Sequence, residues 1–277
     1  MSVLLAIALL AAGPAEPSVK ALVAEARQQV ARQDVAGAHR NLARALASAP
    51  NSEDVLAAYA QVSLAARLPV PALVALEPLT RMFPGDATYQ YLKGVALLQA
   101  GDSPAASEAL ELARRADPDR PLTLLALGLA LNARKLYAEA HPALLRSLEL
   151  EPDNVEVMAA LAETEEGLGD LALARAHAER VLARSASSAT AHLVMGMVHM
   201  KEQRHAEARD AFLRAVAADP GTAKGHYQLS LAYSRLGDEA SAARHLELYQ
   251  RSRQETEERM KQIRNQTGID SAGGMRP

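Results

Sequence analysis

Histidines and clustered glutamates are the residues of this sequence that could bind a metal or take part in acid–base catalysis. His192 and His199 stand seven residues apart, a spacing that places both on one face of a helix. Imidazoles are common metal ligands. However, no pair of the eight histidines has the His-x3-His or His-Glu-x2-His spacing of a compact ligand set. We therefore expect structural packing for these histidines and predict no metal site.

Glu163, Glu165 and Glu166 could supply the paired carboxylates of an acid–base catalyst. Such catalysis also needs a pocket and groups that orient a substrate, and the sequence offers neither. Its glycines are dispersed rather than gathered into a phosphate-binding loop. The absence of cysteine excludes disulfides, zinc knuckles, iron–sulfur ligation and thiol nucleophiles. We predict a protein without catalytic activity and without a cofactor.

The composition favours helices. Of the 277 residues, 49% are apolar but only 3% are aromatic, with two Phe, seven Tyr and no Trp. A chain rich in Ala and Leu and poor in aromatic residues predicts an all-α fold. The 30 basic and 33 acidic residues leave a net charge of −3, which argues against a nucleic-acid partner.

Residues 3–12 read VLLAIALLAA, and small residues follow at Gly13 and Ala15. This apolar run is too short to span a bilayer as a helix but has the length of a signal-peptide core. We expect residues 1–15 to be a signal peptide cleaved before Glu16. No Lys or Arg precedes the run, so a second interpretation stays open, in which it is an apolar helix capping the first packed element.

A 34-residue period organises the rest of the chain. Pro50, Pro84, Pro118 and Pro152 follow one another at this interval, and Pro220 continues the series. An alanine stands twelve residues before the end of every repeat, at 38, 72, 106, 140, 174, 208 and 242. Twelve residues earlier stands a small residue: Ala26, Ala60, Gly94, Gly128, Ala162, Gly196 or Ser230. The period predicts seven repeats, 17–50, 51–84, 85–118, 119–152, 153–186, 187–220 and 221–254.

This pattern resembles the tetratricopeptide repeat (TPR) family, whose 34-residue motif is W-x2-L-G-x2-Y, then A-x3-F, then P. The fourth repeat shows the likeness in Leu127-Gly128, Ala140, Leu144 and Pro152. The tryptophan position never holds Trp, and the tyrosine position holds Tyr only at Tyr233. In the fifth repeat the tyrosine position holds Glu165, which departs from the motif.

The resemblance implies an α-solenoid of seven helix-turn-helix repeats that forms a right-handed superhelix, with the first helix of each repeat (helix A) lining a concave groove. The recurring small residues let helix A approach its neighbours closely. Gly-Asp pairs at 101–102, 169–170 and 237–238 predict the turns from helix A to helix B, with Gly as the left-handed cap and Asp as the next N-cap.

Positions −6, −3, +1 and +4 relative to the small residue share one side of helix A. On this side the middle repeats are apolar, the fifth is acidic and the sixth carries methionines. We hypothesise that the side binds a protein or peptide segment with apolar anchors and one or two basic residues. An alternative stays open, in which these residues pack between helices. The predicted groove residues are Tyr91, Val95, Leu98, Leu125, Leu129, Glu156, Glu163, Glu166, Leu193, Met197, Met200 and Tyr227.

The carboxylate clamp of chaperone-binding TPR members is not expected, because this side has Arg27 as its one basic residue at positions −3 and +1. Residues 255–277 predict a charged helix that continues or caps the last repeat, and then a flexible tail. Two function classes remain. One is a scaffold or adaptor in a periplasmic or secreted complex, and the other is a cytoplasmic regulatory module that senses a peptide or partner protein.

Overall fold

The computed structural model describes residues 17–267. Every regular element among these residues is an α-helix, as the composition and the repeat pattern predict. The chain divides into two compact units, an N-terminal unit of residues 1–82 and a C-terminal unit of residues 83–277. The expected signal peptide at 1–15 and the expected tail after 267 lie outside the described residues.

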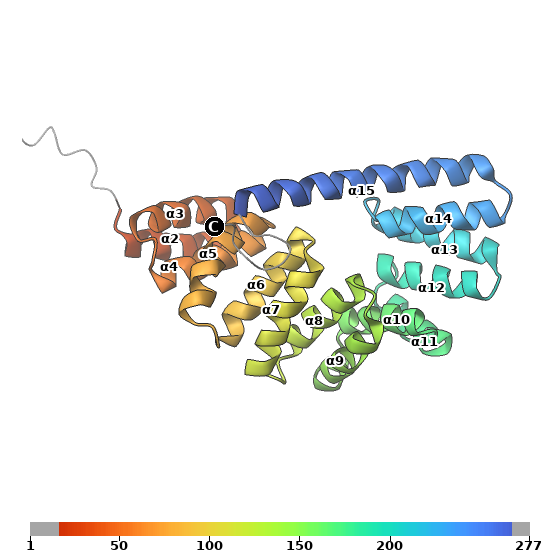
Figure 1. Cartoon of the computed structure of the whole chain (residues 1–277), viewed down its shortest axis with the longest axis horizontal. Coiled ribbons are helices and arrows are strands. Elements are labelled where there is room, and N and C mark those ends of the chain that lie inside the picture. Colours follow the sequence, from red (N-terminus) through yellow and green to blue (C-terminus); the bar gives the residue numbers. More distant parts are fainter. Residues whose placement is uncertain (1–16, 268–277) are drawn as a thin grey trace, which may run out of the picture. The chain divides into compact units, whose positions relative to one another are not determined.

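Both units consist of antiparallel helix pairs, helix A followed by helix B (Figure 1). Within each pair the two helices pack along their length, and each helix B packs on the helix A that follows it within the same unit. The N-terminal unit contains α2 (Val19–Ala31), α3 (Val35–Ser48), α4 (Glu53–Ala65) and α5 (Pro69–Met82).

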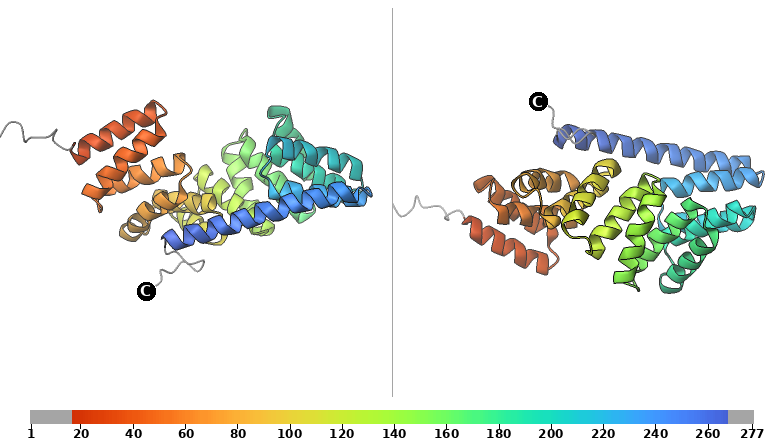
Figure 2. Two further views of the ribbon diagram at one scale, coloured as in Figure 1. Left: turned by 90° about the horizontal axis from the view of Figure 1, so that it is seen from above. Right: turned by 60° about the horizontal axis from the view of Figure 1, so that its bottom comes forward.

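The C-terminal unit continues the same pattern (Figure 2). Its helices A begin 34 residues apart, and so do its helices B. The order is α6 (Ala87–Ala100), α7 (Ser103–Ala116), α8 (Pro121–Ala133), α9 (Tyr137–Leu150), α10 (Val155–Leu168), α11 (Leu171–Arg184), α12 (Ala189–Lys201), α13 (His205–Ala218), α14 (Ala223–Arg235) and α15 (Glu239–Thr267).

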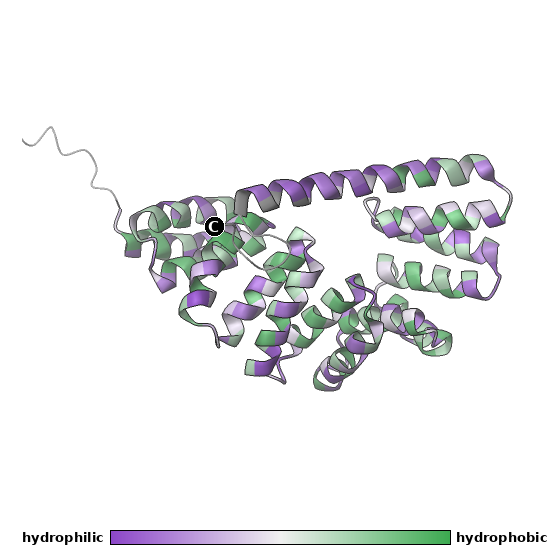
Figure 3. Ribbon diagram, in the orientation of Figure 1, coloured by the Kyte–Doolittle hydropathy of each residue, from purple (hydrophilic) through white to green (hydrophobic). Residues whose placement is uncertain are grey.

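The last helix differs from the others in length. α15 has 29 residues, whereas every other helix has 13 or 14. It passes the predicted repeat end at Gln254 without a break, so the last helix B and the predicted charged helix are one element. Its second half is strongly hydrophilic (Figure 3), which suits a helix surrounded by solvent.

The turns from helix A to helix B all contain one residue with a left-handed backbone. At Gly101, Gly169 and Gly237, φ is between 80° and 92°, so the predicted glycine caps are confirmed. Asp102 and Asp238 accept the predicted N-cap hydrogen bonds from the backbone N–H of Ala105 and Ser241. Asp170 also stands at the predicted N-cap position of α11, but its side chain accepts no capping hydrogen bond. In the other four repeats the same position holds Gln33, Arg67, Lys135 or Gln203, with φ between 55° and 64°.

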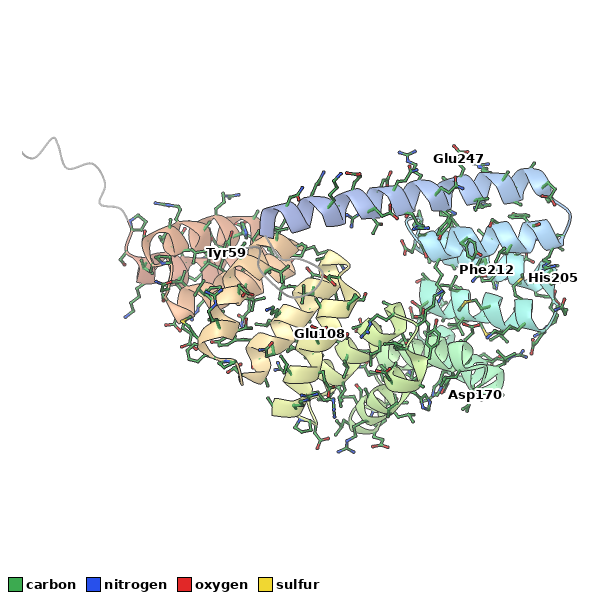
Figure 4. The ribbon with its side chains drawn as sticks, viewed as in Figure 1. Tyr59, Glu108, Asp170, His205, Phe212 and Glu247 are labelled. Carbon is green, nitrogen blue, oxygen red and sulfur yellow. The ribbon has the colours of Figure 1, made fainter. Side chains whose placement is uncertain are left out.

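The small residues of helix A face a large residue of the partner helix B. A Cβ atom added to Gly196 would lie 2.3 Å from the ring of Phe212, and one added to Gly94 would lie 2.4 Å from the side chain of Leu110. These glycines therefore let the two helices of a repeat touch closely. Phe212 is fully buried within a core cluster that α10 to α14 share (Figure 4).

Candidate partner-binding surface

The helices A of the C-terminal unit form one continuous row, because α6, α8, α10, α12 and α14 each contact the next helix A. All twelve predicted groove residues lie on these five helices. The predicted residues therefore lie on neighbouring helices, but their side chains differ widely in exposed fraction.

Four of the predicted residues are buried: Leu125, Glu166, Leu193 and Met197 are 6 to 8% exposed. Leu193 and Met197 belong to the core cluster, and Met200 packs against it. For these apolar residues, packing between helices describes the structure better than an open groove does. Tyr91, Val95, Leu98 and Glu163 are half-buried, whereas Glu156 is exposed. The exposed apolar members are Leu129 and Tyr227, each 40% exposed.

A charge cluster lies on the row at the fifth to seventh repeats. Lys224 Nζ of α14 lies 2.6 Å from Glu163 Oε1 of α10. Lys201 Nζ of α12 lies 2.8 Å from Glu166 Oε1 and also donates to the backbone carbonyl of Glu166 at 2.6 Å. The last bond satisfies a carbonyl near the C-terminus of α10, where a cation is favourable. Glu163 and Glu166, two of the three predicted acidic groove residues, are thus already paired within the chain.

The Glu163–Lys224 ion pair joins α10 to α14, with α12 lying between these two helices. Leu193 and Met197 of α12 are buried in the core cluster that α10 to α14 share. The charges of the cluster also affect the pKa of the nearby Tyr137 hydroxyl. Burial raises the pKa of its hydroxyl, nearby Lys224 lowers that pKa, and Glu163 and Glu166 raise it.

At the other end of the row, the ring of Tyr91 lies under the guanidinium of Arg120, whose Cζ is 4.6 Å from the ring centroid. Burial raises the pKa of the Tyr91 hydroxyl, Arg120 lowers it and Glu156 raises it. This end therefore combines a cation–π pair with the carboxylate of Glu156. Among residues 17–267, Glu156 has no ion-pair partner.

The histidines at the tryptophan position of the motif have a structural role. His192 Nε2 lies 2.8 Å from the carbonyl oxygen of Ala186, and His226 Nε2 lies 3.2 Å from that of Pro220. Gln90 at the same position donates to the carbonyl of Pro84 at 3.1 Å. Each of these side chains thus ties helix A to the end of the preceding repeat. No group of three or more potential metal ligands is found in the part of the chain that the structure describes.

Glu165 is the most buried acidic residue among residues 17–267. Its side chain is 1% exposed, with Oε2 2.8 Å from His177 Nδ1 and Oε1 4.0 Å from His141 Nε2. A Glu–His pair could act as an acid–base dyad. None of these three residues lines either of the two grooves described next.

A groove opens on the described surface of each compact unit. The first, of about 710 Å³, lies between α7 and α9 over the leucines of α8. Its charges are largely paired internally: Glu111 accepts two hydrogen bonds from Arg114, which lower the pKa of the Glu111 carboxyl, and Asp119 accepts one from Arg146. The second, of about 330 Å³, lies between the helices A of the N-terminal unit and is lined by Val23, Arg27, Val30, Asp54, Ala57, Gln61 and others.

Sequence reasoning missed three cations of the helix A row, Arg120, Lys201 and Lys224. Lys224 stands six residues before Ser230, a position that belongs to the groove side by helical spacing. Reading that position in every repeat would have found it. Arg120 and Lys201 lie at the ends of their helices, where spacing alone does not fix the direction of a long side chain.

Comparison with known proteins agrees with this architecture. Two tetratricopeptide repeat models match the sequence, one at residues 29–96 and the other in five overlapping segments from 72–121 to 193–255. Among curated proteins, none matches this sequence. No helix of the described residues combines the length and apolar character needed to cross a membrane.

Solved structures share the fold at low identity. A tetratricopeptide repeat protein from Parabacteroides merdae is 13% identical with a TM-score of 0.68, and the match covers 88% of this chain and 98% of that one. A chain of the APC/C hetero-tetramer Cut9–Hcn1 is 15% identical with a TM-score of 0.61, covering 95% and 52%. YrrB, described as a TPR protein with an unusual peptide-binding site, is 18% identical with a TM-score of 0.51, covering 66% and 95%. With the repeat models matching most of its length, the chain belongs to the tetratricopeptide repeat family.

Proposed function

We propose that this chain is a non-catalytic scaffold that binds a protein segment along the helix A row of its C-terminal unit. The TPR fold supports a role in protein–protein interaction. The observation that carries the proposal is the combination, on one row of helices, of exposed apolar side chains at Leu129 and Tyr227 with the carboxylate of Glu156, which has no ion-pair partner among residues 17–267. YrrB, with its peptide-binding site, is a precedent for the same fold.

The partner segment carries apolar anchors and one or two basic residues. Leu129 and Tyr227 receive the anchors, and Glu156 attracts a Lys or Arg. At the charge cluster, a cation of the partner replaces Lys224 beside Glu163, because a flexible lysine on a partly exposed ion pair gives up little free energy when it returns to water. The specificity is therefore for basic over acidic segments.

A pair of peptide pools tests this chemistry. Both pools place Leu or Tyr at fixed positions, one with Lys and Arg between them and the other with Asp and Glu. We expect the basic pool to bind and the acidic pool not to bind. In Glu156→Gln/Glu163→Gln, affinity for the basic pool falls about fivefold and its salt dependence weakens. Glu108→Gln on α7 removes a carboxylate outside the row and serves as the control (Figure 4). Equal binding of the two pools contradicts the proposal.

We propose further that the scaffold works in the cell envelope or outside the cell, with residues 1–15 acting as an export signal. The apolar run at 3–12 and the small residues at 13 and 15 support this location. Amino-terminal sequencing of the protein from its native cells tests it. A mature chain that begins near Glu16 is expected, whereas retention of Met1 or Ser2 would favour the cytoplasmic regulatory module.

A further inference from the structure

Lys224 stands near the N-terminus of α14, where a cation is unfavourable. It is the second residue of this helix, and the N-terminus of a helix carries a partial positive charge. None of the residues at the same position of the four preceding helices A is basic, and these residues are Thr88, Leu122, Glu156 and Thr190. The stability of α14 therefore does not account for this lysine.

The ammonium of Lys224 has a single acceptor among residues 17–267, Glu163 Oε1 at 2.6 Å. An ammonium has three N–H donors, so this pair uses only one of them, and the lysine side chain is 37% exposed. Lys201, the neighbouring lysine of the row, is bound twice, by Glu166 Oε1 and by the backbone carbonyl of Glu166. Lys224 is therefore the lysine that a partner can displace at the lower cost.

Glu163 keeps an unused acceptor beside this ion pair. Its Oε1 accepts from Lys224, whereas its Oε2 accepts no hydrogen bond from residues 17–267. The glutamate side chain is 23% exposed, so a group of a partner can reach it. A carboxylate binds a guanidinium through two parallel N–H···O bonds, whereas an ammonium forms no such fork. Once Lys224 is displaced, Glu163 therefore binds an arginine more strongly than a lysine.

We infer that Glu163 is a binding site for an arginine of the partner segment and that Lys224 is its internal competitor. This inference rests on the proposed function, because it assigns one residue of the proposed segment. A partner lysine replaces one ammonium with another beside Glu163 and gains little free energy. A partner arginine gains a second hydrogen bond and displaces Lys224 into water. In the free protein Lys224 thus lowers the affinity for every basic segment, and an arginine offsets this loss better than a lysine does.

Two peptide pools test the arginine site by fluorescence anisotropy on the full chain. Both place Leu or Tyr at fixed positions, one with Arg alone and the other with Lys alone between them. We expect the Arg pool to bind the wild type about threefold more tightly than the Lys pool, and Glu163→Gln to reduce this ratio below about 1.5. A ratio that Glu163→Gln leaves unchanged assigns the preference to other residues and overturns the inference.

Variants of Lys224 test the competitor by the sign of their effect. Lys224→Gln is expected to raise the affinity for both pools about threefold, because no internal ammonium has to leave Glu163. Lys224→Arg keeps the charge and is expected to lower both affinities about twofold, because an internal guanidinium holds Glu163 more firmly. In the Glu163→Gln background, Lys224→Gln is expected to raise the affinity less than about 1.5-fold. A general effect of removing a positive charge would persist there.

Lys135→Gln is the matched control, because Lys135 lies in the turn between α8 and α9 and glutamine already stands at the same turn position at Gln33 and Gln203. It is expected to change neither affinity by more than about 1.5-fold. Unchanged or lower affinities in Lys224→Gln overturn the inference and leave the proposed function standing, since the ion pair would then only support the fold. No binding of either pool contradicts the proposed function, and the inference with it.

Discussion

At the scale of single residues, backbone conformation and buried charge determine which residue types each position tolerates. The turn between helix A and helix B needs a left-handed residue in all seven repeats, but only three repeats supply glycine. Gln33, Arg67, Lys135 and Gln203 adopt that conformation against the steric preference of an L-amino acid. The same turn therefore stores a little strain in four repeats and none in the other three.

Gln203→Gly is expected to stabilise the C-terminal unit by about 0.5–1 kcal/mol, because glycine adopts φ = 63° without a Cβ clash. Gly169→Ala is the matched control with the opposite sign. Its added Cβ meets no atom within 4 Å, so the expected loss of about 1 kcal/mol comes from the backbone alone. Urea unfolding measures both. A loss of stability in Gln203→Gly would show that the glutamine side chain contributes more than its backbone costs.

Glu165 makes a second residue-scale prediction. His177→Ala would remove the partner 2.8 Å from a carboxylate that is 1% exposed, and we expect a loss of about 2–4 kcal/mol of unfolding free energy. Glu165→Leu in the same chain should recover at least half of that loss, since Leu97 and Leu131 fill the equivalent position in other repeats. His141→Ala, at 4.0 Å, should cost less than His177→Ala. An equal cost would mean that both histidines hold the carboxylate.

At the scale of helix pairs, the volume of one side chain is matched to the volume of another. The small position of helix A and the large position of helix B hold Gly with Phe at 196 and 212, and Gly with Leu at 94 and 110. The first repeat pairs Ala26 with Leu42, and both are buried. The helix pair thus tolerates a Cβ on helix A when helix B carries the smaller of the two large residues.

Gly196→Ala is expected to destabilise the C-terminal unit by about 1–3 kcal/mol, because its Cβ would overlap the Phe212 ring. Adding Phe212→Leu should restore part of the loss, giving the Ala–Leu pair that the first repeat already uses. Phe212→Leu alone should be destabilising, since it leaves unfilled volume in the core. The double-mutant cycle measures the coupling, and additive free energies would contradict the matched-volume interpretation.

At the scale of the whole molecule, each compact unit holds at least one histidine whose pKa is lowered by burial. Burial lowers the pKa of His39 in the N-terminal unit. In the C-terminal unit burial also lowers the pKa values of His199 and His245. Arg204 and Arg175 add to the lowering at His199, which Glu202 and Glu207 oppose, and His226 and Arg244 add to it at His245. The unfolded chain takes up these protons at a higher pH than the folded chain does. Folding is therefore favoured by this effect above the ordinary histidine pKa and less so below it.

Both units should lose stability as the pH falls from 7.5 through about 6.5, the ordinary histidine pKa, toward the lowered values of the folded state. His39→Phe should reduce this loss in the N-terminal unit, because Phe takes up no proton and can still pack on Tyr59, whose ring centroid is 4.8 Å from that of His39. Hydrogen exchange at pH 7.5 and 5.5 separates the two units. The C-terminal unit should respond as in the wild type. An unchanged pH response of the N-terminal unit would exclude His39 as its source.

The sequence alone determined the all-α fold and the helix-turn-helix pairs, because a small residue, a turn and a proline recur at a fixed interval and each has a local physical cause. The exposure of the groove residues could not be predicted in this way. Leu125 and Leu129 share one side of α8, yet the first is 6% and the second 40% exposed, since exposure depends on how neighbouring helices cross.

Only the tertiary structure decided which charges are free and which faces are covered. Glu163 and Lys224 are 61 residues apart and meet across α12, a contact that no local spacing encodes. Leu246 likewise fits the repeat pattern as well as Phe212 does, yet it is 39% exposed where Phe212 is fully buried. Local propensity fixes an element, whereas coverage depends on what packs against it from elsewhere.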